Sequence, residues 1–210
     1  MPSIILKIPI FSLCILFMKK TLLLILAVIF AKPFASAQDV RFGLKAGANL
    51  ANVSSSFPDT GSLQRFHLGG IMEAKYNSHW ALQPEILYAF QGFEVETNGR
   101  NYTYKLSYIN VPVMVKYFPI DLLYLEAGPQ IGFLHRAKEE VESTSGNTDS
   151  NIKDGMRSND LGLGSGVGLQ LANGWGVGAR YIWGLTNISK SRTVSDIKNS
   201  VLQFYIAYFF

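Results

Sequence analysis

Cysteine and charge are both scarce in this chain of 210 residues. The single cysteine, Cys14, lies near the N-terminus, so residues 38–210 have no disulfide, thiolate zinc site or thiol nucleophile. Charged residues make up 16% of the chain, well below the usual value of about a quarter, and the mean hydropathy is +0.16. This composition excludes a disordered, strongly solvated chain.

Acidic residues are absent from residues 1–37, which contain four of the 19 basic residues. The formal net charge of +4 therefore belongs to this segment, because residues 38–210 hold 15 basic and 15 acidic residues. The same segment accounts for the basic isoelectric point of 9.1. The remainder of the chain is neutral and lacks the basic surface that nucleic acids require, so we expect no nucleic-acid partner.

Residues 1–37 have the organisation of a secretory signal peptide. A pair of lysines precedes an apolar run of 11 residues, 21–31, and a site of the A-x-A type ends at Ala37. The run is too short for a membrane-spanning helix, which needs about 20 apolar residues. We therefore predict a signal peptide over 1–37, with Met18 as a candidate true start. A long uncleaved anchor is the alternative.

A long helical period is also missing from residues 38–210. Apolar and polar residues instead alternate in eight segments, which is the pattern of strands. Short turns near 77–79, 118–121 and 172–174 separate some of these segments. Long polar connections separate the others, near 51–63, 92–101, 136–158 and 186–198. This arrangement predicts an all-β fold, an eight-stranded antiparallel up-and-down barrel over residues 38–210.

The alternation fits either a soluble barrel with an apolar interior or a transmembrane barrel with a polar one. One face of the predicted strands carries most of the strand glycines and the charged residues, and the other carries many aromatic residues. An eight-stranded barrel is so narrow that side chains fill it, and aromatic rings on every strand would overfill it. We therefore predict a transmembrane barrel with outer-membrane lipid around it. Its lumen is predicted to hold a network of ten charged residues, Arg41, Lys45, Arg65, Glu73, Lys75, Glu85, Lys116, Glu126, Asp160 and Arg180.

The charge balance of this network bears on function. Buried charges cost several kcal/mol each unless they are paired, so six basic and four acidic residues favour a closed, charge-filled lumen. Together with a signal peptide, such a barrel predicts the outer membrane of a Gram-negative cell. We expect a structural or surface-interaction protein whose long loops, chiefly 136–158, contact an unknown partner. The alternatives are a narrow porin-like channel for small solutes and, less favoured, a membrane-embedded lipid-modifying enzyme.

No cofactor, metal or catalytic site is predicted. Residues 174–179 match G-x-G-x-x-A, but strand alternation continues through them, whereas a dinucleotide site needs a helix there. His67 with Ser107 or Ser158 could supply a base and a nucleophile, but nothing in the local sequence marks either serine.

The terminal strand ends in Phe210, which predicts recognition by the barrel-assembly machinery.

Several motifs in a fixed order resemble a known family. They are Gly43–Asn49 (GLKAGAN), Pro84–Tyr88 (PEILY), Tyr108–Pro112 (YINVP), Leu125–Gln130 (LEAGPQ) and Gly184–Asn187 (GLTN). With the aromatic last strand, they resemble the PorT-like outer-membrane β-barrel family, whose members are often called porin family proteins. The resemblance covers about the whole of residues 38–210. It implies the barrel fold and the outer membrane, but no biochemical activity.

The signal peptide gives the first testable prediction. We expect the exported protein to begin at Gln38, because the A-x-A site ends one residue earlier. Intact mass and N-terminal sequencing of protein purified from membranes measure this directly. A chain that begins at Met1 or Met18 would contradict the prediction and favour the uncleaved anchor.

Overall fold

The computed structural model describes residues 39–54, 60–97, 100–143, 146–187 and 198–210. The predicted signal peptide and its cleavage site lie outside the described residues. Within the described ranges, no helix is long and apolar enough to cross a membrane.

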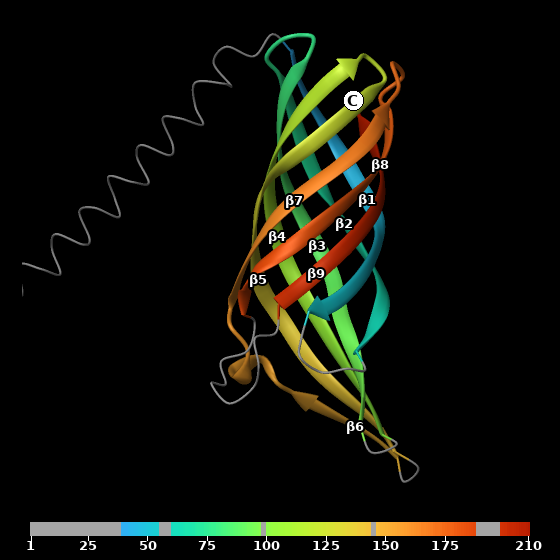
Figure 1. Ribbon diagram of the computed structural model, residues 1–210, viewed down its shortest axis with the longest axis vertical. Helices are drawn as coiled ribbons and strands as arrows, with labels where there is room; N and C mark the ends of the chain where they lie inside the picture. Colours follow the sequence, from blue (N-terminus) through green and yellow to red (C-terminus); the bar gives the residue numbers. More distant parts are fainter. Residues whose placement is uncertain (1–38, 55–59, 98–99, 144–145, 188–197) are drawn as a thin grey trace, which may run out of the picture. The chain divides into compact units, whose positions relative to one another are not determined.

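Strands make up almost all of the described chain, with one short 3₁₀ helix (Figure 1). Their bounds are β1 (Asp39–Ser54), β2 (Thr60–Lys75), β3 (Trp80–Thr97), β4 (Arg100–Ile120), β5 (Leu123–Ser143), β6 (Gly146–Asn151), η1 (Lys153–Gly155), β7 (Asn159–Gln170), β8 (Trp175–Asn187) and β9 (Lys198–Phe209).

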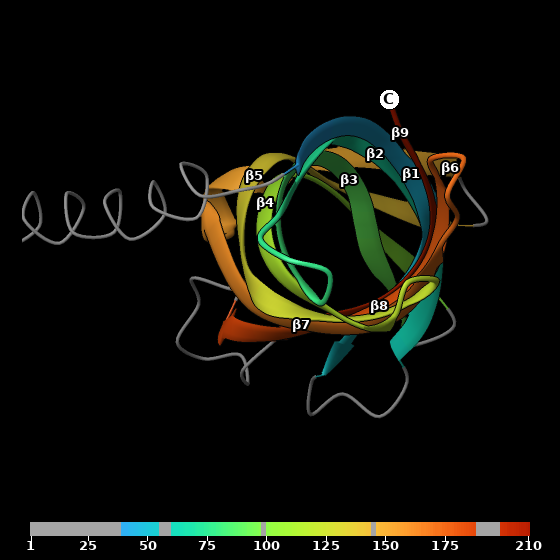
Figure 2. The same ribbon diagram turned by 90° about the horizontal axis from the view of Figure 1, so that it is seen from above.

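Eight of these strands close into one antiparallel barrel, in the order β1, β2, β3, β4, β5, β7, β8 and β9 (Figure 2). The ring closes between the first and last strands, where Gly43 pairs with Phe209 and Ser54 with Lys198. The short strand β6 pairs with β5 alone and lies outside the ring. The predicted eight-stranded up-and-down barrel is therefore confirmed.

Three short connections lie at one end of the barrel, at 76–79, 121–122 and 171–174. Both ends of the barrel sequence, Asp39 and Phe210, lie at this end too, which is uppermost in Figure 1. Transmembrane barrels have short periplasmic turns and longer extracellular connections. The turn end is therefore the periplasmic end.

The extracellular end differs from the sequence prediction in one respect. The prediction of long polar connections near 92–101 and 136–158 is wrong. The strands β3, β4 and β5 continue as paired strands through most of both segments, and β6 pairs with the end of β5. These segments are polar although they form strands, and Glu140 in the second of them forms an ion pair with Lys105 on the neighbouring strand β4. In the described chain, the wall of the barrel is taller here than at β7, and β6 projects beyond it (Figure 1).

The strands are staggered strongly around the ring. A path through paired residues that starts at Lys75 and passes once around the barrel returns to the same strand at Arg65, ten residues away. Closure with such a stagger requires that the strands tilt relative to the barrel axis. Side chains at one height in the lumen therefore come from different register positions.

The two faces of the wall differ sharply in chemistry. Aliphatic side chains point outward and are among the most exposed of the chain, with Leu44 and Ile86 each 64% exposed. Aromatic rings contact each other in pairs on this face, for example Trp175 with Tyr208, whose ring centres are 4.9 Å apart near the turns, and Tyr181 with Trp183, 4.8 Å apart towards the extracellular end. Two aromatic girdles around an apolar band are typical of a barrel in a membrane.

Closure of the barrel predicts heat-modifiable migration in gels. A closed sheet has no free strand edge, so we expect the folded protein to resist SDS until it is boiled. Boiled and unboiled samples should therefore migrate differently. Equal migration of the two samples, after refolding verified by circular dichroism, would contradict a closed barrel.

Candidate functional site

The lumen contains six charged side chains that are almost completely buried, each at most 3% exposed. Three are basic and three are acidic, so this buried set is neutral. All six belong to the ten lumen residues that we predict from the sequence. They are Lys45, Glu73, Glu85, Lys116, Glu126 and Arg180.

Arg180 lies at the centre of the larger group. Its guanidinium donates two hydrogen bonds to Glu85, at 2.7 and 3.0 Å, and two to Glu126, at 2.8 and 2.9 Å. The two carboxylates come from β3 and β5, whereas the arginine comes from β8, so these bonds cross the lumen. A planar guanidinium fits such paired contacts, and a lysine would not replace it.

Glu85 is shared between two bases. Lys45 donates a hydrogen bond to it at 2.9 Å, and the Gln83 amide donates another at 2.6 Å. The same ammonium lies 3.8 Å from the centre of the Tyr205 ring, a distance that suits a cation–π contact. The Lys45 ammonium is therefore held by the Glu85 carboxylate and by the face of the Tyr205 ring.

Two tyrosines complete the group. Tyr205 donates a hydrogen bond to Glu126 at 2.7 Å, and its hydroxyl lies 3.0 Å from that of Tyr124. The sequence analysis did not include either tyrosine in the network. Their positions could have been found, because strand alternation puts Tyr124 on the same face as Glu126.

A second group lies nearer the periplasmic end, around Glu73. This carboxylate accepts hydrogen bonds from Arg41 at 2.6 Å, from Lys116 at 3.0 Å and from Gln170 at 3.0 Å. The strand register places Lys116 directly opposite Glu126, yet it bonds to Glu73 on another strand. The stagger of the barrel explains this choice, because it brings distant register positions to one height.

A glycine makes room for the central ion pair. Gly166 lies between Glu126 and Arg180 in the register of β5, β7 and β8. A Cβ atom at this glycine would lie 2.9 Å from Glu126 Oε1 and 2.5 Å from the carbonyl oxygen of Ala179. Any side chain at this position would therefore disturb the bonds between the arginine and the carboxylate.

Two more inward glycines accommodate the tyrosine rings. A Cβ atom at Gly178 would lie 2.6 Å from the Tyr205 ring, and one at Gly168 would overlap the Tyr124 hydroxyl. The glycine-rich strands β7 and β8 are therefore the thin part of the wall. Large side chains from the other strands fill the space that they leave.

Three predicted network residues do not join an ion pair within the described chain. Asp160 accepts a hydrogen bond from Thr186 at 2.7 Å. The Lys75 ammonium lies 4.8 Å from the centre of the Phe118 ring. Arg65 is half-buried, and its buried Nε has no hydrogen-bond partner among the described residues.

Uncharged polar side chains occupy a layer beyond the central ion pair, towards the extracellular end. His67 Nδ1 lies 2.7 Å from Asn49 Oδ1, and Gln203 donates a hydrogen bond to the same oxygen at 3.1 Å. His67 is therefore bound to an asparagine within the lumen, whereas the sequence analysis weighed it as a partner of Ser107 or Ser158. Within the described ranges, no group of three or more His, Cys, Asp or Glu side chains could hold a metal ion.

The interior is also more apolar than the predicted polar face. Leu87, Met114 and Phe118 point inward and are at most 2% exposed, and Phe209 is 5% exposed. At the extracellular end a buried cluster forms around Leu106, with residues 152 and 156 packed against it. Buried apolar side chains therefore lie towards both ends of the lumen, on either side of the ion pairs.

Comparisons with known proteins agree with this architecture. The sequence matches the family described as outer membrane protein beta-barrel domain over residues 34–190. No curated protein matches the chain.

Several solved structures have a similar fold. Ail, the attachment invasion locus protein of Yersinia pestis, has a TM-score of 0.53 and 15% identity, and the match covers 82% of this chain and 100% of that chain. Ail in complex with the heparin analogue sucrose octasulfate has a TM-score of 0.50 and 16% identity, with the same coverage of 82% and 100%. Neisserial surface protein A has a TM-score of 0.49 and 15% identity, and again the match covers 82% and 100%. Identities this low support the fold alone.

The glycine beside the central ion pair gives a prediction with a matched control. We expect Gly166→Ala to lower the free energy of unfolding by about 1–3 kcal/mol, because an added methyl group in a tightly packed interior forces its neighbours to move. Gly70→Ala is the control, since a Cβ atom there meets nothing within 4 Å. Urea unfolding in detergent, followed by tryptophan fluorescence, compares the two variants. Equal losses would contradict this role of Gly166.

Proposed function

Since this chain belongs to the outer membrane protein beta-barrel domain family and is a protein of the cell outer membrane, we propose that it works there as a closed barrel. Its role is structural or surface-interacting, and its lumen carries no solute flux. The buried ion network supports this proposal. Arg180 spans the lumen between Glu85 and Glu126 with four hydrogen bonds. The interior of an eight-stranded barrel is only wide enough for side chains to fill it.

The surface that contacts a partner is, in this proposal, the tall extracellular part of the wall. The segment 136–158, which we expect to carry the contacts, consists largely of the end of β5 and of β6. One of its charged residues, Glu140 on β5, forms an ion pair with Lys105 on the neighbouring strand β4. A paired sheet presents such side chains at fixed spacing, which suits recognition of a surface better than an irregular loop does.

A narrow channel is the second candidate. The observation that favours it is a set of buried polar atoms without hydrogen-bond partners in the described chain, on the wall formed by β4 and β5. They are the Tyr108 hydroxyl, Asn110 Nδ2 and Gln130 Oε1. Buried polar groups of this kind usually bind water, so water in the extracellular half of the lumen would satisfy them.

Two further proposals concern relatives and partners. We place the chain among the PorT-like members of its family, on the ordered motifs that include Gly43–Asn49 and Tyr108–Pro112. We also propose that the barrel-assembly machinery recognises the last strand, β9, and the exposed Phe210 that follows it.

An enzymatic role has no support from the contacts of His67 described above.

Conductance in planar lipid bilayers tests the closed lumen. We expect no steady conductance from the wild type, because side chains fill the interior. We expect Glu126→Gln to remain closed but to lower the temperature at which the folded gel band disappears. Loss of one member of a buried ion pair costs about 3–5 kcal/mol, and the retained bonds to Glu85 should keep the effect near the lower end or below it.

The same pair of measurements separates the two candidates. Refolding of each variant is verified by heat-modifiable migration before its conductance is recorded. A wild type that conducts steadily, with Glu126→Gln altering ion selectivity without a loss of stability, would contradict the closed barrel. The narrow channel would then replace it.

A further inference from the structure

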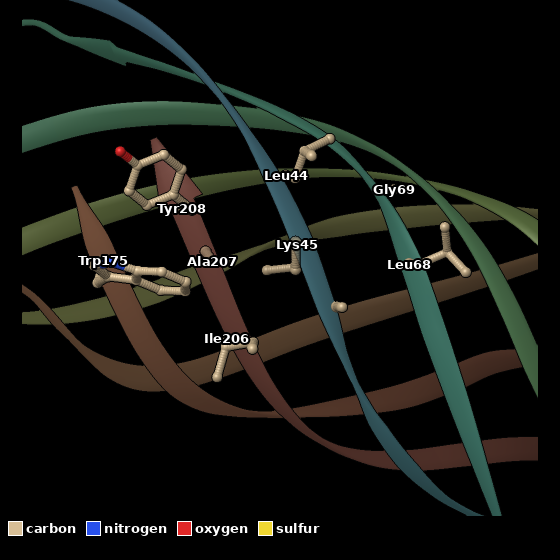
Figure 3. Close-up of a pocket in the computed structure, with 9 residues that line it drawn as sticks. Leu44, Lys45, Leu68, Gly69, Trp175, Ile206, Ala207 and Tyr208 are labelled. Carbon is tan, nitrogen blue, oxygen red and sulfur yellow. The ribbon is translucent and has the colours of Figure 1, made fainter. Parts of the chain in front are cut away.

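The lipid-facing side of the barrel is not uniformly smooth. A groove with a volume of about 330 Å³ runs across β1 and its neighbours on the outer surface (Figure 3). Its walls are formed by Leu68, Trp175, Ile206 and Tyr208, and its lining is almost entirely apolar. The Trp175 indole and the Tyr208 hydroxyl supply its polar side-chain atoms, whereas the Lys45 ammonium lies in the lumen on Glu85.

Small residues create this groove. Ala46 pairs with Leu68 on one side and with Ile206 on the other, so a methyl group lies between two bulky side chains. Gly70 extends the depression along β2, because a Cβ atom there would meet nothing within 4 Å. Most other outward positions carry large apolar side chains, so the depression is a local feature of the sequence.

A second apolar groove lies beside the first, across β1 and β2 towards β3. Its volume is about 530 Å³, and Phe42, Met72, Ile86 and Phe210 line it. Gly70 lines this second groove, whereas its neighbour Gly69 lines the first. The two grooves are therefore adjacent and separated by little more than one strand.

Both grooves begin at the periplasmic end of the barrel. Trp175 follows the 171–174 turn and its ring contacts that of Tyr208 at a tilt, and the Phe210 amide donates a hydrogen bond to the carbonyl oxygen of Phe42. Tryptophan and tyrosine prefer the boundary between lipid chains and headgroups. From there the grooves extend towards Leu68 and Ile86, which lie farther from the turns along their strands.

The shape and chemistry of the grooves limit what can occupy them. One turn of a helix, about 10 Å across and about 5.4 Å long, takes up more than the volume of the smaller groove, so a helix would lie over it and not within it. Apart from Trp175 and Tyr208, the lining residues offer no polar side-chain atom to a headgroup or sugar, since Lys45 and Glu85 bond to each other in the lumen. A flexible hydrocarbon chain matches both the volume and the apolar lining, and the surrounding outer membrane supplies such chains.

We propose that these two grooves bind the two acyl chains of one phospholipid from the periplasmic leaflet, with its headgroup beside Trp175 and Tyr208. Dispersion contacts with the walls hold the chains, since burial from water gives no advantage within a bilayer. The bound lipid fills the depression that Ala46 and Gly70 leave. The barrel thereby keeps one lipid longer than it keeps the lipids around the rest of its surface.

Native mass spectrometry tests the proposal. The barrel is refolded into vesicles of phosphatidylethanolamine and phosphatidylglycerol, extracted in detergent and then stripped of detergent in the gas phase. We expect a peak for one protein with one phospholipid in the wild type. Ala46→Leu and Gly70→Leu fill the first and second grooves, respectively, so each should lose this peak.

Ala127→Leu is the matched control, because Ala127 is an exposed, outward residue of β5, away from both grooves. It should keep the lipid-bound peak, and heat-modifiable migration verifies that all variants fold. Absence of the peak in the wild type would overturn the proposal, as would its equal loss in the control. A wild-type peak at twice the protein mass without lipid would overturn it in favour of a second copy of the chain on this surface.

Discussion

The narrowness of an eight-stranded barrel governs this structure. Little water fits inside such a barrel, so every inward charge must find a protein partner or pay the cost of desolvation. The six most deeply buried charges meet this demand through carboxylate sharing, with Glu73 and Glu85 each bonded to two bases. Glycines on β7 and β8 supply the space, and tyrosine rings fill what remains. The ion pairs, the glycines and the aromatic residues of the lumen therefore form one interdependent packing arrangement.

Strand alternation predicts the barrel, and the six most deeply buried charges lie on the face that it assigns to the lumen. It could not predict which charges would pair, because pairing depends on the stagger of ten residues, and that stagger arises only when the ring closes. Lys116 is an example, since it faces Glu126 in the register but bonds to Glu73. The extracellular segments were mistaken for loops because polar residues normally mark the end of a strand. In a membrane barrel they also mark where a continuing strand enters water.

In the closed barrel that we propose, the outer surfaces of the molecule carry its interactions. At the extracellular end, the extended strands β3, β4 and β5 offer a rigid sheet. On the lipid-facing side of the wall, small residues such as Ala46 leave a groove between bulky side chains, and this groove has the form of a ligand pocket. In the same proposal, the ion pairs of the lumen serve stability, and partners and lipids bind on the outside of the wall.

The hydrogen bonds across the lumen join residues that lie far apart in the sequence, and this separation has a consequence for folding. The arginine and Glu85 are 95 residues apart, and Gln170 and Glu73 are 97 apart. Closure of such long loops costs chain entropy before the contacts form, so topologies rich in them fold slowly. Contacts that are absent from the folding transition state slow unfolding without speeding folding. Ion pairs of the lumen that form after this transition state therefore slow the opening of the barrel and leave its folding rate unchanged.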